Sequence, residues 1–315
     1  MVNTLILAKP RGYCAGVARA VEAVEKVLEI YSPPVYVKHA IVHNVNVVKD
    51  LERKGAIFVE EVKEIPKNSV VVFSAHGSPP HQYEEAKNRN LKLIDAVCPL
   101  VTKVHVEAKT YAQKGYTIIQ VGHRGHLEPI GVEGEVRGVN GEYYLVDNKI
   151  DAEKIDVKRD EIAILTQTTL SLDDTSEIID ILRKKFPRAL FPPSKDICYA
   201  TENRQAAVKL LAKKAELVLV IGSETSSNSN RLREVAESYG SRAYLIDDVT
   251  YINDKWLEGA KVVGLTSGAS VPEYLIDEAI SYFKKLGVEK IQEVEAVEEN
   301  VYFPLPAEVR GRISI

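Results

Sequence analysis

The sequence predicts an α/β protein built from three related units of parallel strands and helices. One pattern supports this class: a short apolar stretch, a cysteine and a helix-like stretch occur in that order three times among the 315 residues. After Cys14, for example, Val17, Val21, Val24 and Leu28 keep the spacing of one helix face. Strands that alternate with helices at this density indicate parallel sheets, whose ligand sites lie beyond the carboxyl ends of the strands.

The first elements of each unit are a strand before the cysteine and a helix after it. The strand-like stretches before Cys14, Cys98 and Cys198 are Thr4 to Leu7, Leu91 to Ile94 and Ala189 to Phe191. After Cys98, the residues Val101, Val104 and Ala108 again follow helical spacing. We therefore expect each cysteine at a helix N-terminus, where the partial positive charge favours a thiolate.

The next elements are a buried strand and a polar loop. The strand patterns begin at Val35, Thr117 and Leu217, and they run into loops that contain His43, His126 and Asn228. These three loop residues follow their cysteines by 29, 28 and 30 residues. Such nearly constant spacing indicates an internal repeat.

Each unit then continues with a helix, a glycine and a strand, and a further strand leads into a second polar loop. The second loops are SAHGSPP from Ser74, TQTTLS from Thr166 and TSGASVPE from Thr266. Pseudo-threefold symmetry would bring the cysteines and both sets of loops to one central cavity. The predicted units are residues 1–97, 98–197 and 198–288, and an extended tail with two prolines is expected over 289–315.

The composition is that of a folded, soluble protein. Hydrophobic residues make up 45% and charged residues 27% of the chain, which is ordinary globular usage. A net charge of -4 argues against broad nucleic-acid binding, and no apolar run approaches the length of a membrane span. We expect a cytoplasmic protein that binds neither nucleic acid nor membrane.

The three cysteines are candidate metal ligands. Disulfides are rare in a reducing compartment, and an odd number leaves one cysteine unpaired. A buried cysteine is often only a small core residue, but all three here occupy the same place in the repeat. Structural zinc sites usually contain a close Cys-x₂₋₄-Cys pair, which this sequence lacks. Widely spaced thiolates suit an iron–sulfur cubane, in which three ligands leave one iron open.

The polar loops are candidates for binding a compact anion such as a diphosphate. Their histidines, hydroxyls and amide are His43, His76, His126, Ser226, Ser227, Asn228 and Ser270. Serine and asparagine also cap helices and form turns, and single histidines are often structural. Helix N-termini beside such groups make an anion site, so both interpretations hold together. The glycine motifs of nucleotide sites are absent from the sequence.

Three further loop residues are candidates for chemistry. Glu128 lies two residues beyond His126, and burial beside an anion would raise its pKa and make it a proton donor. Thr168 and Thr169 could position substrate or relay a proton, or they could cap a strand end. The other histidines are predicted to be structural: His39, His81, His105 and His123.

With these residues in place, the chain resembles the 4-hydroxy-3-methylbut-2-enyl diphosphate reductases of the non-mevalonate isoprenoid pathway. The resemblance rests on an ordered series that spans residues 11 to 270. The series is RGYCAGVARA from Arg11, VHN from Val42, SAHG from Ser74, DAVCPLVTKVH from Asp95, GHRGHLE from Gly122, TQTTLS from Thr166, DICYATENRQ from Asp196, SSNSNRL from Ser226 and SGAS from Ser267.

The resemblance implies a trefoil of three α/β domains around a four-iron, four-sulfur (4Fe-4S) cluster held by Cys14, Cys98 and Cys198. It implies a diphosphate pocket formed by the loop residues given above, with Glu128 as proton donor assisted by Thr169 and with a catalytic role for His126. The implied reaction is a two-electron reductive dehydroxylation to isopentenyl and dimethylallyl diphosphates. A ferredoxin or flavodoxin is the implied electron donor.

Two other functions remain compatible with the residues. A redox-neutral iron–sulfur hydro-lyase would use the same open iron but would need no reductant. A non-enzymatic iron–sulfur sensor would use the polar loops only for capping and would bind no diphosphate.

Overall fold

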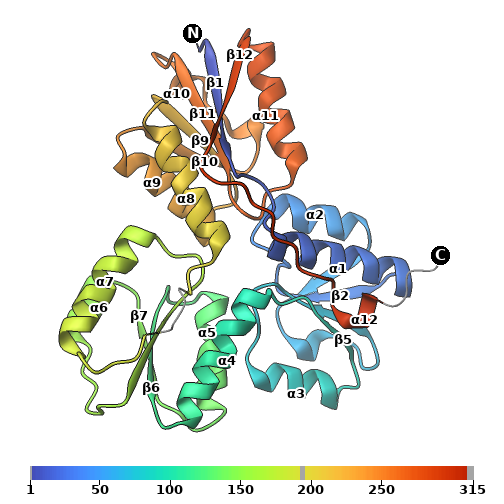
Figure 1. Cartoon of the computed structure of the whole chain (residues 1–315). Helices are drawn as coiled ribbons and strands as arrows, with labels where there is room; N and C mark the ends of the chain where they lie inside the picture. The colour runs from blue at the N-terminus through green and yellow to red at the C-terminus, as the bar shows by residue number, and fades with distance from the viewer. Residues whose placement is uncertain (1, 192–195, 311–315) are drawn as a thin grey trace. The chain divides into compact units, whose positions relative to one another are not determined.

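The structure is a computed structural model that describes residues 2–191 and 196–310. Within these residues the strands form three parallel sheets, and helices connect the strands (Figure 1). The predicted α/β class with parallel sheets is thereby confirmed. None of the helices in the described ranges is long and apolar enough to cross a membrane.

The chain divides into two compact units that are discontinuous in sequence. Unit 1 comprises Met1–Ala18, Val42–Asp50 and Tyr199–Tyr302. Unit 2 comprises Arg19–Ile41, Leu51–Cys198 and Phe303–Ile315. Each unit is described separately below.

Unit 1 contains one sheet, in the order β10-β9-β11-β1-β12. The strands are β1 (Thr4–Lys9), β9 (Leu217–Ile221), β10 (Arg242–Ile246), β11 (Val262–Ser267) and β12 (Lys290–Glu295). The helices are α8 (Tyr199–Ala212), α9 (Ser227–Ser238), α10 (Asp254–Leu257) and α11 (Glu273–Lys285), with a 3₁₀ turn at Val249–Tyr251.

Both faces of this sheet are buried, which explains its continuous apolar strands. On one face, Leu5 and Leu7 of β1 pack in a core that includes Ile276 and Phe283 of α11. On the other face, Ile6 of β1 packs in a second core with residues of α8 and α9 (Figure 1). Alternating residues of one strand therefore serve two cores.

Two strands of unit 1 lie where the sequence did not indicate. β1 belongs to residues 1–97, yet it pairs with β11 and β12 and not with the strands that follow it (Figure 1). β12 lies in the segment 289–315, for which we expected an extended tail, and only Val294 of it is buried. An edge strand with alternating charged residues is hard to distinguish from a tail by pattern alone. Residues 311–315 of this segment lie outside the described residues.

Unit 2 contains two sheets, in the orders β3-β2-β4-β5 and β7-β6-β8. The strands are β2 (Val35–Lys38), β3 (Ala56–Val59), β4 (Val70–Phe73), β5 (Lys92–Asp95), β6 (Thr117–Val121), β7 (Tyr143–Val146) and β8 (Ile162–Thr166). Its helices are α3 (Pro80–Asn88), α4 (Pro99–Gln113), α5 (Leu127–Arg137), α6 (Lys149–Lys154), α7 (Leu172–Lys185) and α12 (Ala307–Arg310), with a 3₁₀ turn at Val62–Glu64. The β6 sheet carries α4 and α5 on one face and α6 and α7 on the other.

Two helices contribute residues to both units. They are α1 (Ala15–Tyr31) and α2 (Val45–Arg53). Their N-terminal turns belong to unit 1, and their later turns belong to unit 2. The start of each helix therefore contributes to the loops of unit 1.

Candidate functional site

One hydrogen bond recurs at all three cysteines. The backbone N–H groups of Cys14, Cys98 and Cys198 donate to the carbonyl oxygens of Ala269 (3.1 Å), Ala75 (3.0 Å) and Thr168 (3.0 Å). Each acceptor lies two residues after the end of a strand, respectively β11, β4 and β8. The cysteines and the second polar loops are therefore tied together in the same way three times.

Each cysteine also directly precedes a helix or caps it. Cys14 comes before α1 and Cys198 before α8, and Cys98 is the N-cap of α4. A helix N-terminus carries about half a positive charge, which favours an anionic ligand there. The three cysteines all lie in the described residues, are partly exposed and form no disulfide.

In unit 1, Ala269 joins Cys14 to the α9 loop. Its carbonyl accepts from Cys14, and its N–H donates to Oδ1 of Asn228 at 2.9 Å. The neighbouring Ser270 hydroxyl donates to the carbonyl of His43 at 3.0 Å. The structure thus brings Cys14, His43, Asn228 and Ser270 together; with Ser226 and Ser227 we call them the unit 1 cluster.

A helix cap fixes the backbone of the unit 1 cluster. Ser226 is the N-cap of α9 and accepts from the N–H of Ser229 at 3.3 Å, and Ser227 begins the helix, half-buried. Asn228 is 5% exposed, and among the described residues its Nδ2 has no hydrogen-bond partner. A buried amide donor left without an acceptor costs free energy, so this group suits an anionic ligand.

In unit 2, His126 caps α5 with its imidazole. Its Nδ1 accepts from the N–H of Glu128 at 3.2 Å, so the neutral ring carries its proton on Nε2. Burial, with a smaller effect from His123, lowers the pKa of His126 to about 4. A second histidine, His76, lies edge-on to it with 6.2 Å between the ring centres.

Glu128 is buried against Thr168. Its carboxylate accepts from the Thr168 N–H at 2.9 Å and from the Thr168 hydroxyl at 2.9 Å. Glu128 is 5% exposed, and burial raises its pKa although both Thr168 groups act in the opposite direction. Glu128 is therefore a weaker acid than an exposed glutamate.

The two units use equivalent positions for Glu128 and Asn228. Each is the second residue of its helix, and each accepts from the N–H of the loop residue whose carbonyl binds a cysteine. In unit 1 that position carries an amide donor, whereas in unit 2 it carries an acid. The same backbone arrangement therefore carries two different functional groups in the two units.

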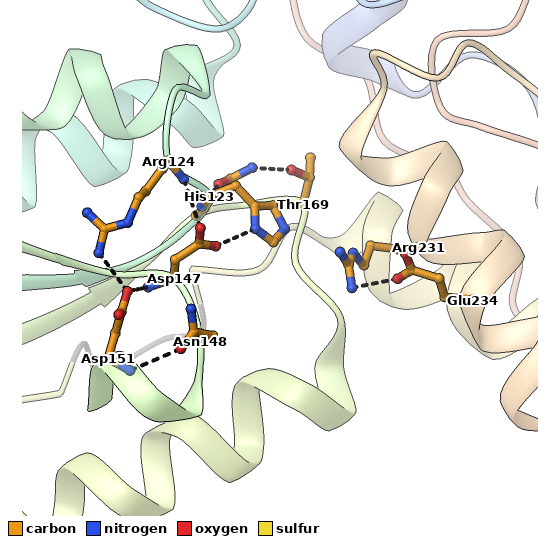
Figure 2. Close-up of polar contacts among 9 residues, drawn as sticks. His123, Arg124, Asp147, Asn148, Asp151, Thr169, Arg231 and Glu234 are labelled. Carbon is orange, nitrogen blue, oxygen red and sulfur yellow. Dashed lines mark hydrogen bonds and ion pairs between the residues drawn. The ribbon is translucent and has the colours of Figure 1, made fainter. Parts of the chain in front are cut away.

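The rest of the unit 2 cluster comes from neighbouring loops. We define this cluster as His76, Cys98, His126, Glu128, Thr168, Thr169 and Cys198. The Thr169 hydroxyl accepts from Nε2 of Gln167 at 2.8 Å, and Gln167 in turn accepts from the N–H of His123. Figure 2 shows His123 directed at Asp147, 2.9 Å away, beside the Arg124–Asp151 ion pair.

Sequence reasoning did not single out two supporting residues. Ser223 is buried, accepts from the N–H of Val45 and donates to Asp247 at 2.6 Å, which fixes the start of α2. Arg204 is fully buried and donates to the carbonyl of Gly12. A signal existed for Arg204, since it occurs on α8 among Ala200, Ala207 and Val208, which are buried.

The unit 1 cluster and the unit 2 cluster contain thiols that could bind a metal, hydrogen-bond donors for an anion, and one buried acid, Glu128. In the described parts of the chain, no group of three or more histidine, cysteine or acidic side chains is arranged to hold a metal ion. The thiols at three helix N-termini are nevertheless soft donors of the kind that iron–sulfur clusters take.

The chain matches the LytB protein family over residues 5–284. It is 52% identical to a 4-hydroxy-3-methylbut-2-enyl diphosphate reductase of Acidothermus cellulolyticus, over 98% of this chain and 91% of that protein. It is also 52% identical to the protein of that name from Psychromonas ingrahamii, over 97% of this chain and 98% of the relative.

A solved structure is similar over nearly the same range. The E-1-hydroxy-2-methyl-but-2-enyl-4-diphosphate reductase from Plasmodium falciparum matches with a TM-score of 0.92 and 38% identity, covering 98% of this chain and 97% of that one. The chain therefore belongs to the LytB family, together with the 4-hydroxy-3-methylbut-2-enyl diphosphate reductases that it resembles.

Proposed function

We propose that the chain is a reductase that removes the hydroxyl of 4-hydroxy-3-methylbut-2-enyl diphosphate and releases isopentenyl and dimethylallyl diphosphates. Relatives at 52% identity carry the name of this activity. The observation that carries the proposal is the repeated bond from each cysteine N–H to a loop carbonyl. This bond links Cys198 through Thr168 to the acid Glu128. It also links Cys14 through Ala269 to the side-chain amide of Asn228.

Cys14, Cys98 and Cys198 fit a 4Fe-4S cluster as three thiolate ligands. All three lie at helix N-termini, where negative charge is favoured. When bound, such a cluster supplies single electrons and, with three protein ligands, one iron that is open to substrate.

The diphosphate is assigned to the polar groups of both clusters. In unit 1, Nδ2 of Asn228 and the N-terminus of α9 offer N–H donors, beside the hydroxyls of Ser226, Ser227 and Ser270. In unit 2, the Nε2–H of neutral His126 is a donor that is not used by the cap. His43 and His76 complete the set, and the remaining substrate contacts are assigned to Thr168 and Thr169.

Glu128 is the proposed proton donor to the departing oxygen. Burial keeps its carboxyl protonated to a higher pH than usual, and Thr168 fixes both of its oxygens. We assign the assisting role to the Thr169 hydroxyl, which accepts from Nε2 of Gln167. The chain itself thus contributes binding, orientation and one proton at a defined atom.

The electrons must come from a one-electron donor, and we assign a protein of the ferredoxin or flavodoxin type. A cytoplasmic location is part of the same proposal, because thiols stay reduced there.

The test is anaerobic turnover of the substrate by reconstituted protein with a one-electron reductant, comparing wild type with Cys98→Ser. We expect both five-carbon diphosphates to form only with reductant and to be lost in the variant. Turnover without reductant would indicate a hydro-lyase instead. A cluster-loaded wild type that neither binds inorganic diphosphate nor turns over would indicate a sensor.

A further inference from the structure

One buried histidine of unit 2 lies outside both clusters. His105 on α4 is 7% exposed, and among the described residues its Nε2 has no hydrogen-bond partner. Its Nδ1 lies 3.8 Å from Oε1 of Glu135, whose Oε2 lies 3.2 Å from Nζ of Lys109. From the sequence we expected a structural role for His105, but a purely structural histidine normally has both nitrogens satisfied.

Two glycines make room for the His105 ring. A Cβ atom at Gly131 of α5 would lie 2.6 Å from Cε1 and 2.8 Å from Nε2 of His105. A Cβ atom at Gly77 would lie 2.9 Å from Nε2. Glycine inside a helix costs about 1 kcal/mol relative to alanine. The glycine at 131 is explained by the imidazole that packs against it.

The same face of α5 carries the proposed proton donor. Glu128, Gly131 and Glu135 are separated by three and four residues, so they share one face of the helix. His105 covers the middle position, with Glu135 on one side and Glu128 one turn away on the other, about 5 Å along the helix. The charge on His105 also acts to lower the pKa of Glu128, as expected for neighbours.

The Glu135 side of His105 opens into a cavity of about 450 Å³. Its lining includes Tyr83, Asp95, His105, Lys109 and Glu135. The cavity leads toward solvent, whereas the carboxylate of Glu128 is buried against Thr168. A substrate above Glu128 would separate the acid further from water, so the acid needs another source of protons.

We propose that His105, held by Glu135, returns protons from this cavity to Glu128 after each turnover. This inference rests on the proposed function. The reaction uses two electrons from the one-electron donor and two protons: the C–O bond breaks, one proton leaves with the oxygen as water, and carbon takes the other. Glu128 becomes a carboxylate, His105 in its imidazolium form gives it one proton, and the neutral ring takes one proton from solvent in the cavity.

Glu135 and His105 have separate tasks in this route. The Glu135 carboxylate lies 3.8 Å from Nδ1 of His105 and orients the ring. The ring nitrogen nearer to Gly131 passes the proton over about one helical turn, a span that one hydrogen-bonded water bridges. His105 is thus a positioning and relay residue that acts through Glu128 and does not touch the substrate.

The experiment compares His105→Gln, Glu135→Gln and His105→Ala in cluster-loaded full chain at saturating reductant. His39→Gln is the matched control, because His39 forms a second histidine–glutamate pair, with Glu60, in the same unit. We expect kcat of His105→Gln to fall at least about 10-fold while KM and cluster content stay unchanged. In Glu135→Gln, kcat should also fall, because the ring loses the carboxylate that orients it. Added imidazole should restore kcat of His105→Ala through the cavity.

Several charged groups around His105 also affect the pH profile of kcat. These are Glu128 and Glu135 on α5, Lys109 on α4, His76 beside Gly77, and Tyr83, Glu84 and Asp95 in the cavity wall. Wild-type kcat and pH profile in His105→Gln would overturn the proposal. The proposal would also be wrong if kcat of His105→Ala fell and imidazole did not restore it, while His105→Gln stayed fully active. An inactive wild type would instead count against the proposed function itself.

Discussion

Arg204 donates to the carbonyl oxygen of Gly12 at 2.8 Å from a fully buried position. The same guanidinium pairs with Glu299 at 3.0 Å and donates to the carbonyl of Ala200 at 3.1 Å. Gly12 lies two residues before Cys14 and has a φ of +72°, which favours glycine. The loop that presents Cys14 is therefore held by a fully buried arginine, which pairs with the partly exposed Glu299.

Replacing this arginine should destabilise unit 1 strongly. Arg204→Met removes the donor of the Gly12 carbonyl and leaves the Glu299 carboxylate with Asn203, and loss of a hydrogen bond to a charged group costs about 1.5–3 kcal/mol. The fluorescence of the single tryptophan, Trp256, which stacks on Tyr244 in unit 1, reports denaturant unfolding. Arg233→Met is the control: its pair with Glu237 is exposed, and a change below about 0.5 kcal/mol is expected. Equal effects in both variants would contradict this account.

Local pattern predicted the cysteine–helix junctions because strand and helix periodicities are local properties. The helix starts after Cys14 and Cys98 follow directly from apolar spacing, whereas the strand-like stretch expected before Cys198 forms only an isolated bridge between Leu190 and Ala163. The partner of a strand, however, depends on segments far apart in sequence, such as Thr4 opposite Val262. The uninterrupted apolar run of β1 was consistent with a central strand, but it did not indicate which sheet.

The candidate site was predictable only at the level of loops. Glu128 and Asn228 were recognised from their loops, yet their shared role as acceptors for Thr168 and Ala269 depends on backbone geometry. Ala269 and Ala75 have no functional side chain, so no sequence signal could mark their carbonyls as partners of cysteines. The close packing of His105 was not predictable, because it comes from two glycines on other elements.

Glu128→Gln should abolish most turnover without loss of the cluster. The amide keeps the shape and can still accept from the Thr168 N–H, but it cannot give up a proton as an acid. Removal of a general acid reduces kcat by about 10²–10⁴-fold. Glu133→Gln on the same helix is the control, because Glu133 is partly exposed and pairs with Arg137. Cluster absorbance and anaerobic kinetics are measured on both variants, and wild-type kcat in Glu128→Gln would remove it from the mechanism.

Asn228→Asp should weaken binding of diphosphate. The substitution keeps an oxygen for the Ala269 N–H but replaces the Nδ2 donor with a second, negatively charged oxygen. Loss of a hydrogen bond to a charged group costs about 1.5–3 kcal/mol, so the Kd for inorganic diphosphate should rise about 10- to 100-fold. Asn148→Asp, at the N-cap of α6 in Figure 2, makes the same chemical change at a comparable backbone contact. Calorimetric titration should show no change for this control, and a similar loss in both variants would argue against a specific contact.

His126→Asn should make stability less dependent on pH in the acid range. The pKa of His126 is lowered from 6.5 to about 4 by burial, so between these values the unfolded chain binds more protons than the folded one. The free energy of unfolding of wild type therefore falls as pH drops from 6.5 toward 4.

Asparagine also caps helices well, so the variant His126→Asn keeps the cap of α5 but has no group to protonate. Denaturant unfolding at pH 7, 6 and 5 should give a shallower slope for His126→Asn and the wild-type slope for the exposed control His81→Asn. Because Glu128 has its pKa raised, its contribution has the opposite sign and remains in both proteins, so the difference between the slopes isolates His126. Identical slopes would mean that the His126 ring is protonated in the folded protein as readily as in the unfolded chain.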